Sequence, residues 1–148
     1  MAKKIYEACR RLLTTCANCQ PDENILIVTD TDSLEIGMAL WDAAEEFPKK
    51  TMVMMEPRKM HGEEPTPLVA AAMLKADVIF RATKFSLSHS HARRDACAAG
   101  ARDLNCCDYS IEMLEKGGLY TDFEADRKYV DQLLKSMANG DQVHITSD

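Results

Sequence analysis

The chain has 148 residues, of which 46% are hydrophobic and 28% charged, a composition typical of a globular protein that excludes a disordered or fibrous chain. A net charge of −6 without a basic cluster argues against a nucleic-acid partner. No uncharged apolar run reaches the roughly 18 residues of a membrane span, and the first residues lack the apolar core of a signal peptide, so we expect a cytoplasmic protein without a membrane partner.

Three of the six cysteines lie in or just after the first helical pattern. Apolar residues recur there at intervals of three and four, which predicts a helix with Cys9 and Cys16 on its buried face. Its apolar positions are Ile5, Ala8, Cys9, Leu12, Leu13 and Cys16. Cys16 and Cys19 form a C-x-x-C motif, but the adjacent Cys106 and Cys107 do not complete a second one. Reduced thiols are therefore favoured over a zinc site.

Strand-like and helical patterns then alternate along the chain. A continuous apolar run of β-branched character predicts a strand buried on both faces at 24–29, and further strands are predicted at 51–55, 77–81 and 104–106. Helical spacing and capping residues predict helices that start near Asp32 and at 66, 91, 110 and 122. The first of these has its apolar face at Ile36, Leu40, Ala43 and Phe47. The last has an apolar stripe at Val130, Leu133, Leu134 and Met137, and Asn139 with Gly140 is its expected C-cap.

This alternation with short connections predicts an α/β fold: a doubly wound, mainly parallel sheet with helices on both faces, in three layers of the flavodoxin or Rossmann type. Ligands of such sheets bind beyond the carboxyl ends of the strands. The loops expected at that edge are 30–33, 56–65, 82–90 and 107–110.

The loop at 30–33 lacks the features of two phosphate motifs. It has no glycine before Gly37, and its two carboxylates would repel a pyrophosphate, which argues against NAD. Asp30-x-Asp32 after a strand is similar to the nucleophile motif of haloacid dehalogenases, but no later strand ends in an acidic pair for magnesium. We expect Asp32 to cap the following helix and Asp30 to close a turn.

The densest polar cluster lies at 83–91, and two interpretations of it stay open. In one, it is a substrate-contacting loop in which His89 donates a hydrogen bond or acts as an acid or base near neutral pH. In the other, Ser88 or Ser90 caps the next helix and the histidines are surface residues. Metal binding by His89 and His91 requires an extended backbone, because on a helix the two side chains diverge by about 200°.

A second candidate, His61, lies in the ten-residue loop 56–65. This loop is long for a strand-to-helix connection, and such loops are often functional. His61 and Glu64 either contact a polar ligand or are simply solvated. His144, in the strand-like run 142–147, is expected on the polar face of a strand.

Three groups of residues carry a resemblance to a known family. They are Ile25–Asp30 with Leu34–Gly37, His61–Pro65 with Pro67, and Ser86–Arg93 with Gly100–Arg102. Together they resemble the amino-terminal half of the aminopeptidase T-like metallopeptidases of the thermophilic type and of their relatives, the iron-dependent dihydroxypyridine dioxygenases. The sequence departs from that pattern at 106–108, where Cys-Cys-Asp replaces a Met-Pro-Gly-like turn.

The resemblance implies a two-domain enzyme in which this α/β domain lines one wall of the active cleft. Leu87, Ser88 and His89, helped by His61, would face the substrate. The metal ligands of the family belong to the carboxyl-terminal domain, so a divalent zinc, cobalt or iron ion is expected there and no metal or other cofactor is expected in this chain. The leading hypothesis is an aminopeptidase-like hydrolase. The alternatives are a ring-cleaving dioxygenase with the same domain and a stand-alone, non-catalytic binding module.

The resemblance also implies a division of the chain. Residues 1–140 would form the substrate-cleft domain and 141–148 would begin the missing metal-binding domain. Because enzymes of two domains have about twice this length, roughly as much again is expected to follow. The expected partners are a small-molecule or peptide substrate and, as a further option, a second copy of the chain in a homodimer.

Overall fold

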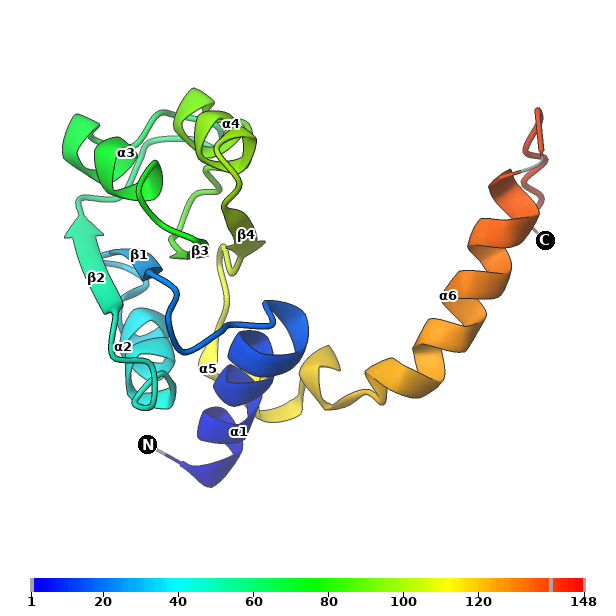
Figure 1. Ribbon diagram of the computed structural model, residues 1–148, viewed down its shortest axis with the longest axis horizontal. Helices are drawn as coiled ribbons and strands as arrows, with labels where there is room; N and C mark the ends of the chain where they lie inside the picture. Colours follow the sequence, from blue (N-terminus) through cyan, green and yellow to red (C-terminus); the bar gives the residue numbers. More distant parts are fainter. Residues whose placement is uncertain (1, 139, 148) are drawn as a thin grey trace.

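The computed structural model describes residues 2–138 and 140–147, which form a sheet of four parallel strands. The strands are β1 (Ile25–Asp30), β2 (Lys50–Met55), β3 (Val78–Ala82) and β4 (Arg102–Asn105), in the order β2-β1-β3-β4. The chain steps outward from β1 to β2 and then returns across β1 to β3 and β4 (Figure 1). This confirms the doubly wound parallel sheet and places its switch point between β1 and β3.

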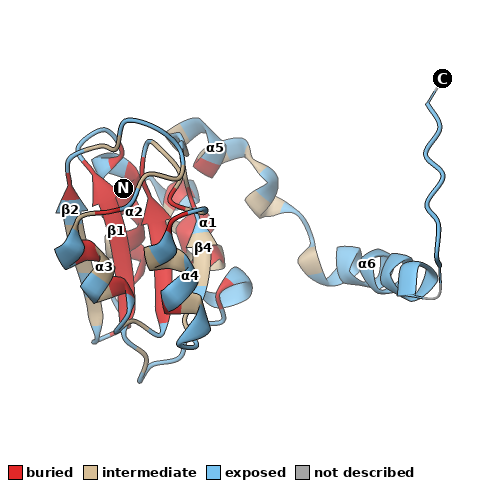
Figure 2. Cartoon of the chain, turned by 90° about the horizontal axis from the view of Figure 1, so that it is seen from above, coloured by how far each residue is buried: buried red, intermediate tan, exposed pale blue. Residues whose placement is uncertain are grey.

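Helices cover both faces of this sheet. They are α1 (Lys3–Arg11), α2 (Leu34–Ala43), α3 (Pro67–Met73), α4 (His91–Ala98) and α5 (Ile111–Lys116). A 3-10 turn, η2 (Gly118–Tyr120), and a last helix, α6 (Phe123–Ala138), follow α5. Side chains of α1, α2 and α5 pack with Ile25 and Ile27 of β1, whereas those of α3 and α4 pack with Leu26 and Val28. Strand β1 is therefore buried on both faces, as its continuous apolar run predicts (Figure 2).

The end of the first helix differs from the prediction. A π-helical turn, η1 (Leu12–Cys16), follows α1, and the amide of Ala17 donates to the carbonyl of Leu12 at 2.9 Å, five residues back. The wider turn rotates the residues that follow it relative to an α-helical pattern. Cys9 is buried as predicted, but Cys16 is exposed, so its expected burial was wrong.

The start of α2 also differs. Ser33 occupies the N-cap position without a side-chain hydrogen bond to any described residue, and Asp32 is exposed, so the expected cap by Asp32 was wrong. The predicted apolar face is confirmed, with Ile36, Leu40, Ala43 and Phe47 all buried. The helix ends at Ala43, and Phe47 reaches the core from the turn after it.

Helix α6 projects away from the sheet (Figures 1 and 2) and buries none of its side chains. Its predicted stripe forms on one helix face but is exposed, with Leu133 at 62% and Leu134 at 59%. The C-cap prediction at Asn139 lies outside the described residues. The described residues 140–147 form no strand, so the expected strand around His144 is not present. Among the described helices, none combines the length and the apolar character that a bilayer crossing requires.

Candidate functional site

The carboxyl ends of β1 and β3 are joined by one buried carboxylate. Asp30, the last residue of β1, is fully buried. One oxygen accepts the amide of Ser33 at 2.9 Å and closes the turn before α2, as predicted. The other accepts the amide of Lys84 at 2.7 Å and fixes the start of the loop after β3. The sequence did not reveal this second contact, because it joins positions 54 residues apart.

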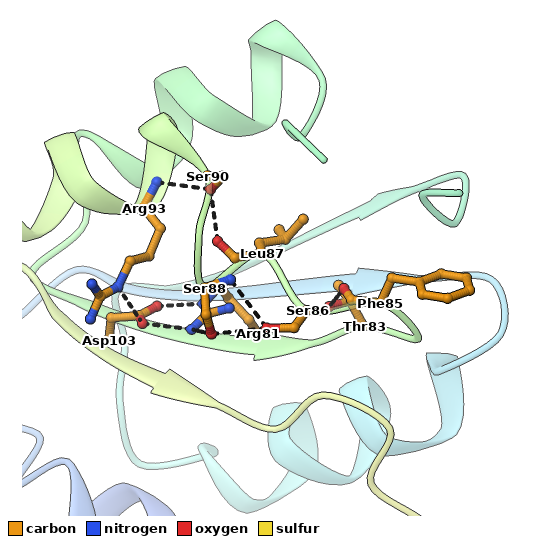
Figure 3. Close-up of polar contacts among 9 residues, drawn as sticks. All are labelled: Arg81, Thr83, Phe85, Ser86, Leu87, Ser88, Ser90, Arg93 and Asp103. Atoms are coloured by element: carbon orange, nitrogen blue, oxygen red, sulfur yellow. Dashed lines mark hydrogen bonds and ion pairs between the residues drawn. The ribbon is translucent and has the colours of Figure 1, made fainter. Parts of the chain in front are cut away.

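The loop 83–90 is held by its own serine and threonine side chains (Figure 3). The hydroxyl of Thr83 donates to the carbonyl of Phe85 at 2.9 Å, and Ser86 Oγ accepts the amide of Ser88 at 3.1 Å. Ser90 caps α4, because its Oγ accepts the amide of Arg93 at 3.2 Å and donates to the carbonyl of Leu87 at 2.8 Å. The prediction of a serine cap is therefore confirmed for Ser90.

The neighbouring loop 56–65 is bound to this one by His61 and Gly62. The amide of Ser86 donates to His61 Nδ1 at 3.0 Å, and the amide of Gly62 donates to the carbonyl of Ser86 at 2.7 Å. The His61 ring also meets the ring of Phe85 edge to face, with centroids 5.3 Å apart. Because Nδ1 of a neutral imidazole accepts a hydrogen bond here, the proton lies on Nε2, which is a donor.

Glu64 makes a further contact between the two loops, at the beginning of α4. Its carboxylate accepts the amide of His91 at 2.5 Å and that of Ala92 at 3.1 Å. The amide of His91, followed by that of Ala92, lowers the pKa of Glu64 although partial burial raises it. Glu64 is therefore a structural residue that occupies the free N–H groups of this helix end.

The structure places three of the four predicted substrate-binding residues at the surface of these loops. His61 and His89 are exposed and Ser88 is half-buried, whereas Leu87 is fully buried beneath the loop. A Cβ built on Gly62 would lie 3.5 Å from the Cβ of His89, so the two histidine-bearing segments are in contact. His61, Ser88 and His89 thus share one edge of the sheet, and Leu87 shapes the loop from the core side.

Charged residues around this surface are mostly paired. At the rim, Lys84 Nζ lies 2.7 Å from a carboxylate oxygen of Asp108, and this contact raises the pKa of Lys84 and lowers that of Asp108. Beneath the loop, Arg81 pairs with Asp103 at 2.6 Å. The sequence alone did not reveal this buried pair, although an arginine inside a predicted strand was the available signal.

One part of the family resemblance lies at the opposite end of the sheet. Gly100 ends α4 with a φ of 108°, a conformation that favours glycine. Arg102, at the amino end of β4, binds Glu23 through two hydrogen bonds of 2.9 and 2.6 Å and the carbonyl of Ala17 at 2.9 Å. Arg102 of the Gly-Ala-Arg segment therefore anchors the loop that follows η1.

Comparisons of the chain with protein-family models, with curated proteins and with solved structures found no match. Within the described ranges, no three histidine, cysteine or acidic side chains are grouped so that they could hold a metal ion. A cavity of about 370 Å³ lies on the α1 and α5 side, between Leu104, Tyr109 and Met113. That cavity does not include the loops at the switch point.

Proposed function

We propose that this domain is the substrate-binding wall of a metal-dependent, aminopeptidase-like hydrolase. The observation that carries the proposal is the placement of His61, Ser88 and His89 on one exposed edge at the switch point of the sheet. The segments that resemble the aminopeptidase T-like enzymes converge there, with the exception of Gly100–Arg102. Because the resemblance assigns the metal ligands to a carboxyl-terminal domain, the role proposed for this chain is binding and orientation of the substrate.

The available hydrogen-bond donors favour a peptide over a phosphorylated ligand. Asp30 already accepts the amides of Ser33 and Lys84, and Glu64 accepts those at the start of α4. A phosphate would find these backbone groups occupied and would meet the carboxylate of Glu64. The Nε2–H of His61 and the ring of His89 are suited to single acceptor oxygens, such as peptide carbonyls.

A binding experiment on the 148-residue chain tests this proposal. A short neutral peptide such as Leu-Gly-Gly is titrated into the ¹⁵N-labelled protein, and the expected amide shifts are confined to 61–62 and 84–91. His89→Ala should weaken binding, whereas His144→Ala, which changes an exposed histidine away from the loops, should leave it unchanged.

Two results would contradict the peptide-binding role. One is the absence of shifts at millimolar peptide, and the other is equal weakening by both histidine variants. A parallel titration with a hydroxypyridine distinguishes the hydrolase from the dioxygenase alternative. Selective binding of that ring would favour the dioxygenase over the hydrolase.

A further inference from the structure

A buried arginine lies directly beneath the candidate loop. Arg81 belongs to the inner strand β3, and the side chains of Arg81 and Asp103 are only 1% and 2% exposed. Two parallel hydrogen bonds of 2.6 and 2.7 Å join Nε and Nη2 of the guanidinium to the carboxylate. Arg93 adds a third contact to Asp103 at 3.2 Å from the helix above (Figure 3).

This ion pair has a feature that stability alone does not explain. Nη1 of Arg81 is buried and has no hydrogen-bond partner among the described residues. An unpaired buried donor destabilises the folded state, and buried ion pairs are often no more stable than apolar residues of similar size. A strand whose other side chains are apolar would be expected to have an apolar residue here, which points to a role of Arg81 in the loop it contacts.

The guanidinium is connected to the candidate site through two serines. Nη2 of Arg81 donates to Ser88 Oγ at 3.2 Å, and the hydroxyl oxygens of Ser86 and Ser88 lie 2.9 Å apart, within hydrogen-bond distance. Because arginine can only donate, Ser88 Oγ accepts from Arg81, and with Ser86 as the donor of the hydroxyl pair the hydrogen of Ser88 is left to donate outside this network. The backbone of Ser86 in turn binds His61 Nδ1. Arginine stays protonated at all physiological pH values, so it is a permanent donor in this arrangement.

We propose that Arg81 is a positioning residue which, together with Asp103, makes Ser88 a hydrogen-bond donor toward the ligand. Ser88 O–H and His61 Nε2–H then present two donors from adjacent loops, which suits a carbonyl or carboxylate oxygen of a peptide. The inference rests on the proposed function and adds the specificity of its site: recognition of an acceptor oxygen.

The test is a double-mutant cycle on the affinity for Leu-Gly-Gly, with Arg81→Lys and Ser88→Ala. Lysine keeps the charge beside Asp103 but lacks the guanidinium fork that also reaches Ser88. Each single variant should bind the peptide about two- to tenfold more weakly, as expected for the loss of one hydrogen bond. In the Ser88→Ala background, Arg81→Lys should cause no further loss, because Arg81 acts through Ser88. Ser88→Thr, which keeps the hydroxyl, should restore binding.

The control is Ser136→Ala, which removes an exposed hydroxyl in α6 and should leave the affinity unchanged. If Arg81→Lys lowers the thermal midpoint but not the affinity, or weakens binding equally in both backgrounds, Arg81 has a structural role and the inference is wrong. The ¹⁵N resonances of the His61 ring give a readout without a ligand, and Arg81→Lys should shift them. If the wild-type chain binds no peptide, the proposed function fails, and an unchanged His61 ring in Arg81→Lys would separately overturn the positioning role.

Discussion

Substitution of Asp30 by asparagine isolates the contribution of the carboxylate that joins β1 to the loop after β3. Asparagine has almost the same shape, but only one of its two terminal atoms can accept a hydrogen bond. Its oxygen can keep one of the bonds to Ser33 and Lys84, and its NH₂ group then faces the other backbone N–H. The folded variant therefore contains a buried pair of donors that face each other.

The magnitude follows from the two contacts. A hydrogen bond to a charged acceptor is worth about 1.5–3 kcal/mol, and a buried donor left without a partner costs a further 1–3 kcal/mol or so. Since Asp30 is fully buried, solvent cannot replace the lost acceptor. We expect Asp30→Asn to lower the free energy of unfolding by about 2–4 kcal/mol, allowing for partial relaxation of the loop.

Urea denaturation at neutral pH measures this change, and amide exchange locates it. The N–H of Ser33 or of Lys84 should lose protection. The matched control is Asp32→Asn, the same substitution at an exposed carboxylate two residues away, for which we expect a change within about 0.5 kcal/mol. A loss below about 1 kcal/mol for Asp30→Asn, or one equal to that of the control, would refute the role assigned to this carboxylate.

Three further predictions concern packing, pH and thiol chemistry. Gly37→Ala should lower the free energy of unfolding by about 1–3 kcal/mol in urea denaturation, because the added Cβ would lie 2.8 Å from Thr29 Oγ1. A gain in stability would contradict the close approach of α2 to β1. The lowered pKa of Glu64 stabilises the fold above the ordinary value of 4.5, and this contribution is lost as the pH falls through the folded-state pKa. Thermal midpoints should therefore decline more steeply in acid for the wild type than for Glu64→Gln, and parallel profiles would count against the contact. Burial raises the pKa of the Cys106 thiol to about 12. Peptide mapping after thiol labelling at pH 8 should therefore find Cys97 modified in the folded protein and Cys106 modified only after unfolding. Early labelling of Cys106 would show that this part of the core opens.

The parts of the fold that the sequence predicts are those set by local periodicity. The run 25–28 is apolar and, except for Leu26, β-branched, and the strand that contains it is buried on both faces. The face of Ile36 and Leu40 follows from helical spacing alone. Cys16 was misplaced because the turn Leu12–Cys16 is π-helical, with a hydrogen bond five residues back instead of four, and this changes the direction of the side chains in that turn. The pattern of side chains contains no signal for it.

The contacts that the sequence did not reveal depend on pairing between distant segments. Arg81 meets Asp103 because the register of β3 and β4 sets Arg81 opposite Asn105, two residues beyond Asp103 and on the same face. In the candidate site, the histidines and serines were identified from their loops, but the buried position of Leu87 depends on how the loop folds back over the sheet. The run 142–147 has the alternation of a strand, yet alternation alone forms no strand without a partner.

The bonds between the loops at the switch point have a kinetic consequence. Asp30, Glu64 and the contact of His61 with Ser86 fix the backbone on both sides of the exposed histidines. The proposed ligand can then bind without a conformational change in these loops, so its association should not be slowed by a step of loop closure. For the proposed peptide ligand, discrimination would accordingly appear in the residence time, and we expect the side chains of Ser88 and His89 to set it.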